Sequence, residues 1–366
     1  MSNPPVHVTR PFLPPLEEFI PYLEEIWTSG HLTNGGPMHQ RLEAALCEYL
    51  GVPHLCLFNN GTSALMVALQ ALELQGEVIT TPYSFVATAN AIAWNGLDPV
   101  FVDVEPTYLN LSPEAIEAAI TENTSAIVPV HCYGNPCDTA AIDAIARRHG
   151  LKVVYDAAHA FGVRDSEGSI LRHGDLAVLS FHATKVFNTF EGGAVVCHDL
   201  EMKQRLDRLK NFGLDGESRL AATGMNGKLN EVSAAFGLLQ LKHIDTALEA
   251  RKKIDTHFRL ALEKLPGLSA LPRGRQTNDN FSYFPVLVEP SYPLSRDELL
   301  TCLAERGIHG RRYFHPLIPD FEHSPFRGGD WPVARDASDR VLCLPIYPGL
   351  SSDELDRIVY ALREAR

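Results

Sequence analysis

Strand and helix patterns alternate between about residues 55 and 200, and this alternation constrains the possible folds of the chain most strongly. Short apolar runs predict strands at residues 77–81, 99–104, 126–131, 152–155, 176–181 and 194–197. Between them, helices are predicted over 112–122, with Ser112 as N-cap and Pro113 at the first position, and over 139–149, ended by Gly150. Strands that alternate with helices form a mostly parallel sheet flanked by helices, so the sequence predicts an α/β fold.

The last third of the chain follows a different pattern. From residue 229 to residue 265 apolar residues recur at helical spacing, until Pro266 and Gly267 interrupt them. The remaining patterns predict a strand near 281–288 and helices over 296–306 and 352–364. We expect the long helix to connect two domains, a large domain over 1–245 that includes the N-terminal segment and a smaller α+β domain over 246–366.

Composition and charge argue against several classes of protein. The net charge is −13 and there is no run of basic residues, which argues against nucleic acid as a partner. No stretch approaches the ~20 apolar residues that span a bilayer, and residues 1–7 lack the basic and apolar regions of a signal peptide. The seven cysteines are scattered, without a Cys-x-x-Cys pair. We therefore expect no membrane association, no metal, reduced thiols and a cytoplasmic location.

A lysine and an aspartate follow two of the predicted strands. Lys185 comes just after the apolar run 176–181. Burying an amine there costs free energy, which favours a chemical function for the side chain. Alternatively, the side chain could extend into solvent. Asp156 ends the run 152–155, and His159 follows three residues later. Ligands of open α/β sheets bind at the carboxyl ends of the strands, so Asp156 and Lys185 would face one crevice. A pyridoxal phosphate enzyme needs this pair, a lysine for the Schiff base and an acid opposite the pyridinium nitrogen. Alone, Asp156 could simply be a turn residue.

A phosphate site is predicted where residues 59–63 precede an apolar helix pattern over 64–72. The unpaired N–H groups and the positive dipole end of a helix N-terminus favour a phosphate dianion. Thr62 and Ser63 add hydroxyl donors, although such residues at a helix start are often only N-caps. The motif lies in the same part of the predicted sheet as Asp156 and Lys185 and supports the cofactor hypothesis.

Five segments together resemble the DegT/DnrJ/EryC1/StrS family of sugar aminotransferases, which belong to the fold-type I class of pyridoxal phosphate enzymes. These segments are residues 32–37, 81–88, 152–162, 181–193 and 224–228. The resemblance extends over nearly the whole length. Residues 11–19 and 186–189 are similar to a subgroup that acts on dTDP-4-keto-6-deoxyglucose. The resemblance implies an aminotransferase that forms dTDP-4-amino-4,6-dideoxyglucose from dTDP-4-keto-6-deoxy-D-glucose, with L-glutamate as amino donor.

The same resemblance implies roles for individual residues. Lys185 would form the Schiff base and Asp156 would keep the pyridine nitrogen protonated, as the two catalytic residues. His159 would lie near the phenolic oxygen of the cofactor, and Phe85 would stack on its ring, although either could instead be a core residue. The phosphate would bind Gly61, Thr62, Ser63 and Ser180. Asn226 would reach it from the neighbouring subunit, so that each active site is shared across a homodimer.

The sequence leaves several alternatives open. At position 228 many relatives have arginine, and Lys228 cannot make the bidentate contact of an arginine. A 3-aminotransferase typically has a tyrosine and a later Gly-Asp pair where this chain has His182 and Glu191, whereas the 4-aminotransferases have the residues found here. A dehydratase relative would replace Lys185 by histidine. The nucleotide could also be UDP or GDP, and a non-catalytic regulatory protein could share the fold.

An anionic nucleotide-sugar requires a local positive cluster in a chain whose net charge is negative. The candidates for this cluster are Arg10, Lys228, Arg311 and Arg312.

Overall fold

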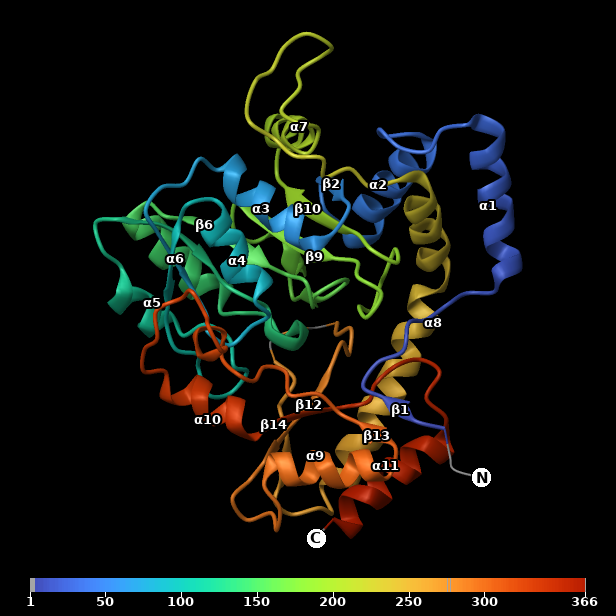
Figure 1. Cartoon of the computed structure of the whole chain (residues 1–366), viewed down its shortest axis with the longest axis vertical. Coiled ribbons are helices and arrows are strands. Elements are labelled where there is room, and N and C mark those ends of the chain that lie inside the picture. The colour runs from blue at the N-terminus through green and yellow to red at the C-terminus, as the bar shows by residue number, and fades with distance from the viewer. Residues whose placement is uncertain (1–3, 275, 277, 366) are drawn as a thin grey trace.

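The computed structural model describes residues 4–274, 276 and 278–365, and its centre is a seven-stranded sheet (Figure 1). The strand order is β2-β10-β9-β6-β5-β3-β4. The strands are β2 (His54–Phe58), β3 (Glu77–Thr80), β4 (Asp98–Phe101), β5 (Thr124–Val128), β6 (Lys152–Asp156), β9 (Leu176–Ser180) and β10 (Gly193–Cys197). All neighbours are parallel except β10, which is antiparallel to both β2 and β9. The predicted α/β fold with a mostly parallel sheet is therefore confirmed.

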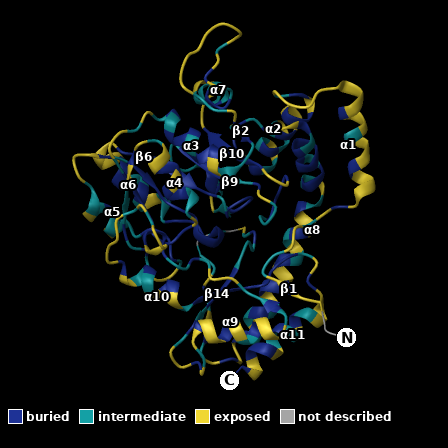
Figure 2. Cartoon of the chain, viewed as in Figure 1, coloured by how far each residue is buried: buried dark blue, intermediate teal, exposed yellow. Residues whose placement is uncertain are grey.

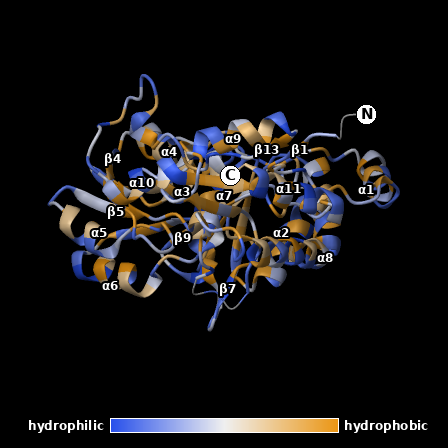
Figure 3. Ribbon diagram, turned by 90° about the horizontal axis from the view of Figure 1, so that it is seen from below, coloured by the Kyte–Doolittle hydropathy of each residue, from blue (hydrophilic) through white to orange (hydrophobic). Residues whose placement is uncertain are grey.

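Alternate residues of these strands pack on opposite faces of the sheet, as the pleat requires. Leu55 and Leu57 belong to one core cluster, whereas Cys56 and Phe58 belong to another. The first cluster lies under α1 (Leu16–Ser29), α2 (Pro37–Leu50), α5 (Pro113–Ala119), α6 (Thr139–His149) and the first half of α8 (Glu231–Leu262). The second lies under α3 (Gly61–Ala71), α4 (Ala87–Trp94) and α7 (Leu200–Leu209). Helices thus cover both faces, and Figures 2 and 3 show the buried apolar strands between them.

A second, antiparallel sheet lies below the first in Figure 1, with the order β11-β12-β14. Its strands are β11 (Leu268–Ala270), β12 (Phe284–Val288) and β14 (Val341–Leu344). The last part of α8, α9 (Arg296–Glu305) and α11 (Ser352–Glu364) share a core cluster with these strands. The division into domains at residue 245 stays a prediction.

Shorter elements complete the described part of the chain. The N-terminal strand β1 (Val6–His7) runs parallel to β13 (Ile308–His309) beside the second sheet. The others are β7 (Arg164–Asp165), β8 (Gly168–Ser169), α10 (Pro332–Arg340) and short 3₁₀ turns at Cys132–Gly134, Ile170–Arg172 and Ile318–Asp320. In the part of the chain described, we find no helix with both the length and the apolar character needed to cross a membrane.

Most predicted elements are present, with differences at their ends. The helices predicted over 139–149 and 352–364 have those bounds, and the long helix predicted over 229–265 is α8. The strand β2 was not predicted. The helix α3 begins at Gly61, earlier than predicted, because the Asn60 side chain caps it by accepting from the Ser63 N–H at 2.8 Å.

Candidate active site

The carboxyl ends of neighbouring strands meet at a cavity of about 290 Å³. The strands β6 and β9 are adjacent and parallel and end at Asp156 and Ser180, so both side chains reach the same edge of the sheet. The predicted site residues that line the cavity are Gly61, Thr62, Phe85, Asp156, His159, Ser180 and Lys185. Residues more than 120 positions apart in the sequence are therefore brought together by the order of the strands.

Lys185 directs its amine toward this cavity rather than into bulk solvent. Its Nζ donates to the hydroxyl of Tyr283 at 3.3 Å and lies 5.8 Å from the centre of the Tyr283 ring. Burial lowers the pKa of Lys185 to about 8, against the opposing influence of Asp156 and Tyr313. An amine with this pKa is partly neutral near pH 8, which makes it a competent nucleophile.

Asp156 is a buried carboxylate held by two hydrogen bonds. Its Oδ2 accepts from the Thr88 hydroxyl at 2.7 Å, and its Oδ1 accepts from the Ala158 N–H at 3.1 Å. Burial raises the pKa of Asp156, whereas the Thr88 hydroxyl, the Ala158 N–H and the Lys185 charge lower it. The contact with Ala158 is the turn interaction that a structural aspartate would make. Because the side chain also lines the cavity, its position allows a chemical role as well.

His159 is a buried, neutral imidazole at the side of the cavity. Burial, followed by the charge of Lys185, holds the pKa of His159 well below its usual range. Its Nδ1 accepts from the Tyr133 N–H at 3.2 Å, which assigns the ring proton to Nε2. The ring stacks on Phe314 and meets the Tyr283 ring edge-on at 4.8 Å between centres. Packing of this kind is typical of a core histidine, but this one also faces the cavity.

The first turn of α3 also borders the cavity and lies against Ser180. A Cβ atom on Gly61 would lie 2.9 Å from the Cβ of Ser180, so a glycine is needed for this close approach. Thr62 and the N–H groups of the first turn are then presented to the cavity. Ser63 does not line the cavity, because its hydroxyl donates to the side chain of Asn59 and the carbonyl of Asn60.

Two further predicted residues lie at the margin of the site. Asn226 is exposed, and its carbonyl accepts from the Asn59 side chain at 3.4 Å, next to the start of α3 but outside the cavity lining. Phe85 lines the cavity and is 60% exposed, which is unusual for a residue that serves only the core. An open aromatic face beside a cavity is suited to stacking on a planar ligand.

The model of the DegT/DnrJ/EryC1/StrS aminotransferase family matches residues 16–363. The chain belongs to this family. It is 59% identical over 364 residues, 99% of each chain, to a dTDP-4-amino-4,6-dideoxy-D-glucose transaminase from Shigella dysenteriae. It also resembles the structure of DesI in the presence of its TDP-sugar product, with a TM-score of 0.95, 34% identity and coverage of 99% of this chain and 93% of DesI. It is also similar to the structure of NtdA from Bacillus subtilis with bound cofactor PMP, with a TM-score of 0.88, 27% identity and coverage of 98% of this chain and 85% of NtdA.

Aminotransferases of this family use pyridoxal phosphate, so the predicted enzyme class and cofactor are confirmed. The residues present fit the cofactor. The close approach of Gly61 to Ser180 presents N–H and hydroxyl donors suited to a phosphate in the cavity. Asp156 and the amine of Lys185 supply the buried acid and the nucleophile in the same cavity.

Other residues of the site were not found by sequence reasoning. Tyr283, Tyr313 and Phe314 line the cavity from segments next to the second sheet, and Thr88 contacts Asp156. Thr88 is the last residue of segment 81–88, one of the five that carry the family resemblance. Its place in that segment could have identified it as a site residue. No local pattern identifies the three aromatic residues, because ordinary core positions have the same composition.

A larger cavity of about 720 Å³ adjoins the first and shares with it Ser84, Phe85, Thr184, Tyr313 and Phe314. Of the basic candidates, Arg311 and Arg312 line it. Lys228 instead donates to the Asn211 side chain at 2.6 Å, and Arg10 is exposed at the surface. His7 and His309 also line the larger cavity, with their rings stacked 5.1 Å apart.

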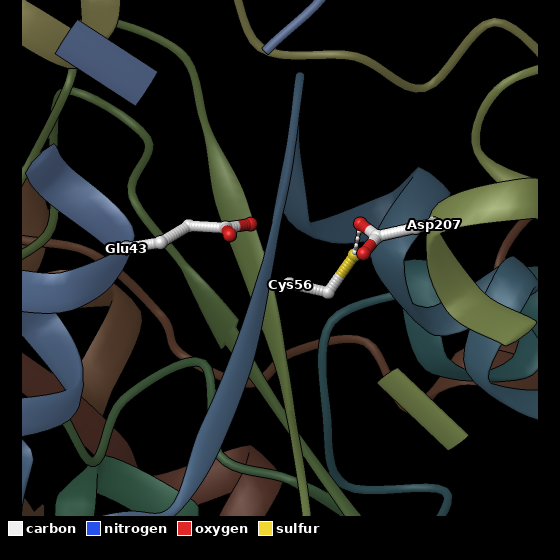
Figure 4. A group of neighbouring side chains, drawn as sticks. All are labelled: Glu43, Cys56 and Asp207. Atoms are coloured by element: carbon white, nitrogen blue, oxygen red, sulfur yellow. Dashed lines mark hydrogen bonds between the residues drawn. The ribbon is translucent and has the colours of Figure 1, made fainter. Parts of the chain in front are cut away.

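A separate acidic group, Glu43, Cys56 and Asp207, converges between α2, β2 and α7 (Figure 4). Two lysines occupy this space as counter-charges. Lys203 Nζ lies 3.0 Å from Glu43 and 2.7 Å from Asp207, and Lys210 Nζ lies 2.8 Å from Asp207. Because two ammonium groups already balance the two carboxylates, we interpret the group as a buried ion-pair network that joins the three elements.

Proposed function

We propose that the chain transfers an amino group from L-glutamate to C4 of dTDP-4-keto-6-deoxy-D-glucose and so forms dTDP-4-amino-4,6-dideoxyglucose. The observation that carries this proposal is 59% identity, over nearly the full length of both chains, to a transaminase named for that product. The motif residues His182 and Glu191 support the C4 position. Both line the 290 Å³ cavity that contains Lys185, and His182 Nε2 lies 3.6 Å from the Glu191 carboxylate.

Lys185 and Asp156 would carry the chemistry. When bound, pyridoxal phosphate accepts the electron pair of the carbon that loses its proton. Lys185 would hold the cofactor covalently, and its freed amine would then carry that proton. Asp156 would keep a proton on the ring nitrogen of the cofactor, and Thr88 would orient the carboxylate.

The remaining predicted residues would bind and orient the cofactor. Gly61, Thr62 and Ser180 would hold its phosphate at the start of α3. Ser63 would act one step further away, by fixing Asn59 and Asn60. The exposed ring of Phe85 would cover one face of the cofactor, and the neutral His159 would offer its Nε2 proton to the phenolic oxygen.

The larger cavity would receive the nucleotide part of the substrate. Arg311 and Arg312 bring positive charge to it in a chain of net charge −13, as a diphosphate requires, although Arg312 also pairs with the Asp297 carboxylate at 3.3 Å. The aromatic residues shared by the two cavities would lie where the sugar passes from one to the other. A dTDP, UDP or GDP group would satisfy this charge equally well, so the relative's name, and not the cavity, favours dTDP.

We also propose a homodimer with shared active sites. Asn226 lies beside the phosphate end but outside the lining of its own cavity, a position from which it could serve a partner. The segment 212–224, which projects beyond α7 in Figure 1, exposes Phe212, Leu214 and Leu220. On the part of the chain described, exposed apolar side chains grouped on a projecting segment favour an association surface.

We also propose that the protein is located in the cytoplasm. Cys56, Cys132, Cys197 and Cys343 are buried free thiols, which is typical of proteins from reducing compartments.

A substrate screen tests the proposed function. The purified enzyme is supplied with L-glutamate and, in separate reactions, with the dTDP-, UDP- and GDP-linked 4-keto-6-deoxy sugars. We expect bleaching of the bound cofactor's visible absorbance by glutamate alone, and the highest kcat/KM with the dTDP sugar. A non-catalytic relative would bind the cofactor without this bleaching, and preference for UDP or GDP would contradict the nucleotide assignment.

A further inference from the structure

Tyr283 lines the same cavity as Lys185 and contacts its amine. It lies just before β12, next to the second sheet, and its hydroxyl oxygen accepts from Lys185 Nζ at 3.3 Å. No other side-chain hydrogen bond of the Lys185 amine is found in the described part of the chain. Tyr283 is therefore the group that fixes the direction of this amine in the structure.

The segment that carries Tyr283 is anchored from two directions. Asn280, which is 1% exposed, donates to the carbonyls of His159 and Phe161 and so ties the segment to the loop after β6. Arg251 of α8, also buried, donates to the carbonyls of Phe281 and Ser282 from the other side. Support of this kind preorganises a side chain that must hold one geometry.

The Tyr283 hydroxyl is neutral and keeps its own proton. Burial raises the pKa of Tyr283 well above its usual value. Its ring packs edge-on against His159, Tyr133 and Tyr313, at 4.8, 5.9 and 5.6 Å between centres. Among the described residues the hydroxyl donates to no acceptor, so its proton is available to an oxygen atom of a ligand in the cavity.

We propose that Tyr283 is the positioning residue of Lys185, holding the amine toward the cavity through its hydroxyl oxygen while its own proton faces the bound ligand. This inference rests on the proposed role of Lys185. A hydrogen-bond acceptor favours the charged form of an amine, so removing the Tyr283 hydroxyl should favour the neutral form of Lys185.

Several other charged or titratable groups lie near Lys185, and their influence on its amine must be separated from that of Tyr283. Asp156 at the end of β6 and Tyr313 both raise the pKa of Lys185. His159 is neutral, and His182 and Glu191 line the same cavity. None of these groups is altered by removing the Tyr283 hydroxyl, so among the described residues the Tyr283→Phe variant removes only the contact with Lys185 in the enzyme without a ligand.

The test compares Tyr283→Phe with Tyr133→Phe and the unchanged enzyme. Tyr133 is the matched control, because it is a buried tyrosine of the same aromatic group whose hydroxyl bonds Tyr83 and the Tyr313 carbonyl instead of Lys185. The full chain is depleted of cofactor, and the rate of pyridoxal phosphate capture at Lys185 is followed by absorbance across pH. Only the neutral amine attacks, so the midpoint reports its titration.

We expect the midpoint of Tyr283→Phe to lie about one pH unit below that of the unchanged enzyme, and that of Tyr133→Phe to be unmoved. In the complete reaction, Tyr283→Phe should lower kcat about tenfold with little change in the KM of the amino donor. Coincident midpoints for Tyr283→Phe and the unchanged enzyme would overturn the proposal.

Two controls keep the result interpretable. Should Tyr283→Phe unfold, Asn280→Ala removes the two hydrogen bonds that anchor the segment carrying Tyr283, and its midpoint should move in the direction expected for Tyr283→Phe. An unmoved midpoint in this variant would contradict the proposal. The capture measurement contains no sugar. A failure to aminate dTDP-4-keto-6-deoxy-D-glucose would therefore count against the proposed function alone, and the midpoints would still decide the role of Tyr283.

Discussion

Removing the Thr88 hydroxyl should shift the pH dependence of the reaction. Thr88 lies in the first turn of α4, is 1% exposed, and donates to Asp156 Oδ2 at 2.7 Å. Thr88→Val keeps the branched shape of the side chain and removes the donor. The Ala158 N–H and the charge of Lys185 would then be the remaining influences that lower the pKa of Asp156.

The magnitude follows from the type of hydrogen bond. A hydrogen bond to a charged group contributes about 1.5–3 kcal/mol, and 1.36 kcal/mol corresponds to one pKa unit, so the pKa of Asp156 should rise by about 1–2 units. The ionised carboxylate is the active form, and burial already raises its pKa. The acid limb of the kcat profile should therefore move to higher pH by about 1–2 units, with a loss of about 10- to 100-fold below that limb.

The assay is kcat against pH with saturating substrates, together with cofactor absorbance and thermal unfolding of each variant. Thr81→Val is the matched control, because the buried Thr81 hydroxyl accepts from the Tyr83 N–H instead of contacting Asp156. Its acid limb should coincide with that of the unchanged enzyme. If the limb of Thr88→Val also coincides with it, the hydrogen bond does not control the ionisation of Asp156.

Three further predictions concern the lysine, the dimer and the buried ion pairs. Lys185→Ala should retain bound pyridoxal phosphate without its covalent link and lose amino transfer; turnover at the unchanged rate would refute the assignment. Mixing Lys185→Ala with Asn226→Asp should restore activity, because one hybrid site has neither lesion, and normal cofactor binding by Asn226→Asp alone would exclude a shared site. Glu43→Gln should lower the free energy of unfolding by about 3 kcal/mol, because Lys203 and Lys210 lose a counter-charge. This is measured by denaturant titration, and a change below about 0.5 kcal/mol would contradict the interpretation.

The parallel sheet could be predicted because each strand is a short apolar run bounded by a helix pattern. The strand β2 escaped prediction, although its residues 54–58 are largely apolar. A short apolar run directly before an apolar helix cannot be separated from that helix by periodicity alone. The pairing of β1 with β13 joins two-residue strands about 300 positions apart, and no local pattern predicts such a contact.

Some residues of the site could likewise be predicted from the sequence, and others could not. Lys185 and Asp156 follow predicted strands, so topology alone places them at one edge of the sheet, and Gly61 lies just before a predicted helix. The roles of Ser63 and Tyr283 depend on side-chain direction and on the position of the second sheet. The sequence pattern predicts neither, because both are set by tertiary packing.

The position of the new amine in the product tests the central claim most directly. The enzyme is incubated with L-glutamate and dTDP-4-keto-6-deoxy-D-glucose, and the product is characterised by mass spectrometry and NMR. We predict a dTDP-linked 4-amino-4,6-dideoxyhexose, the gluco isomer with an equatorial amine. An amine that forms only when a 3-keto isomer is supplied would contradict the proposed reaction, although the family and the cofactor would stand.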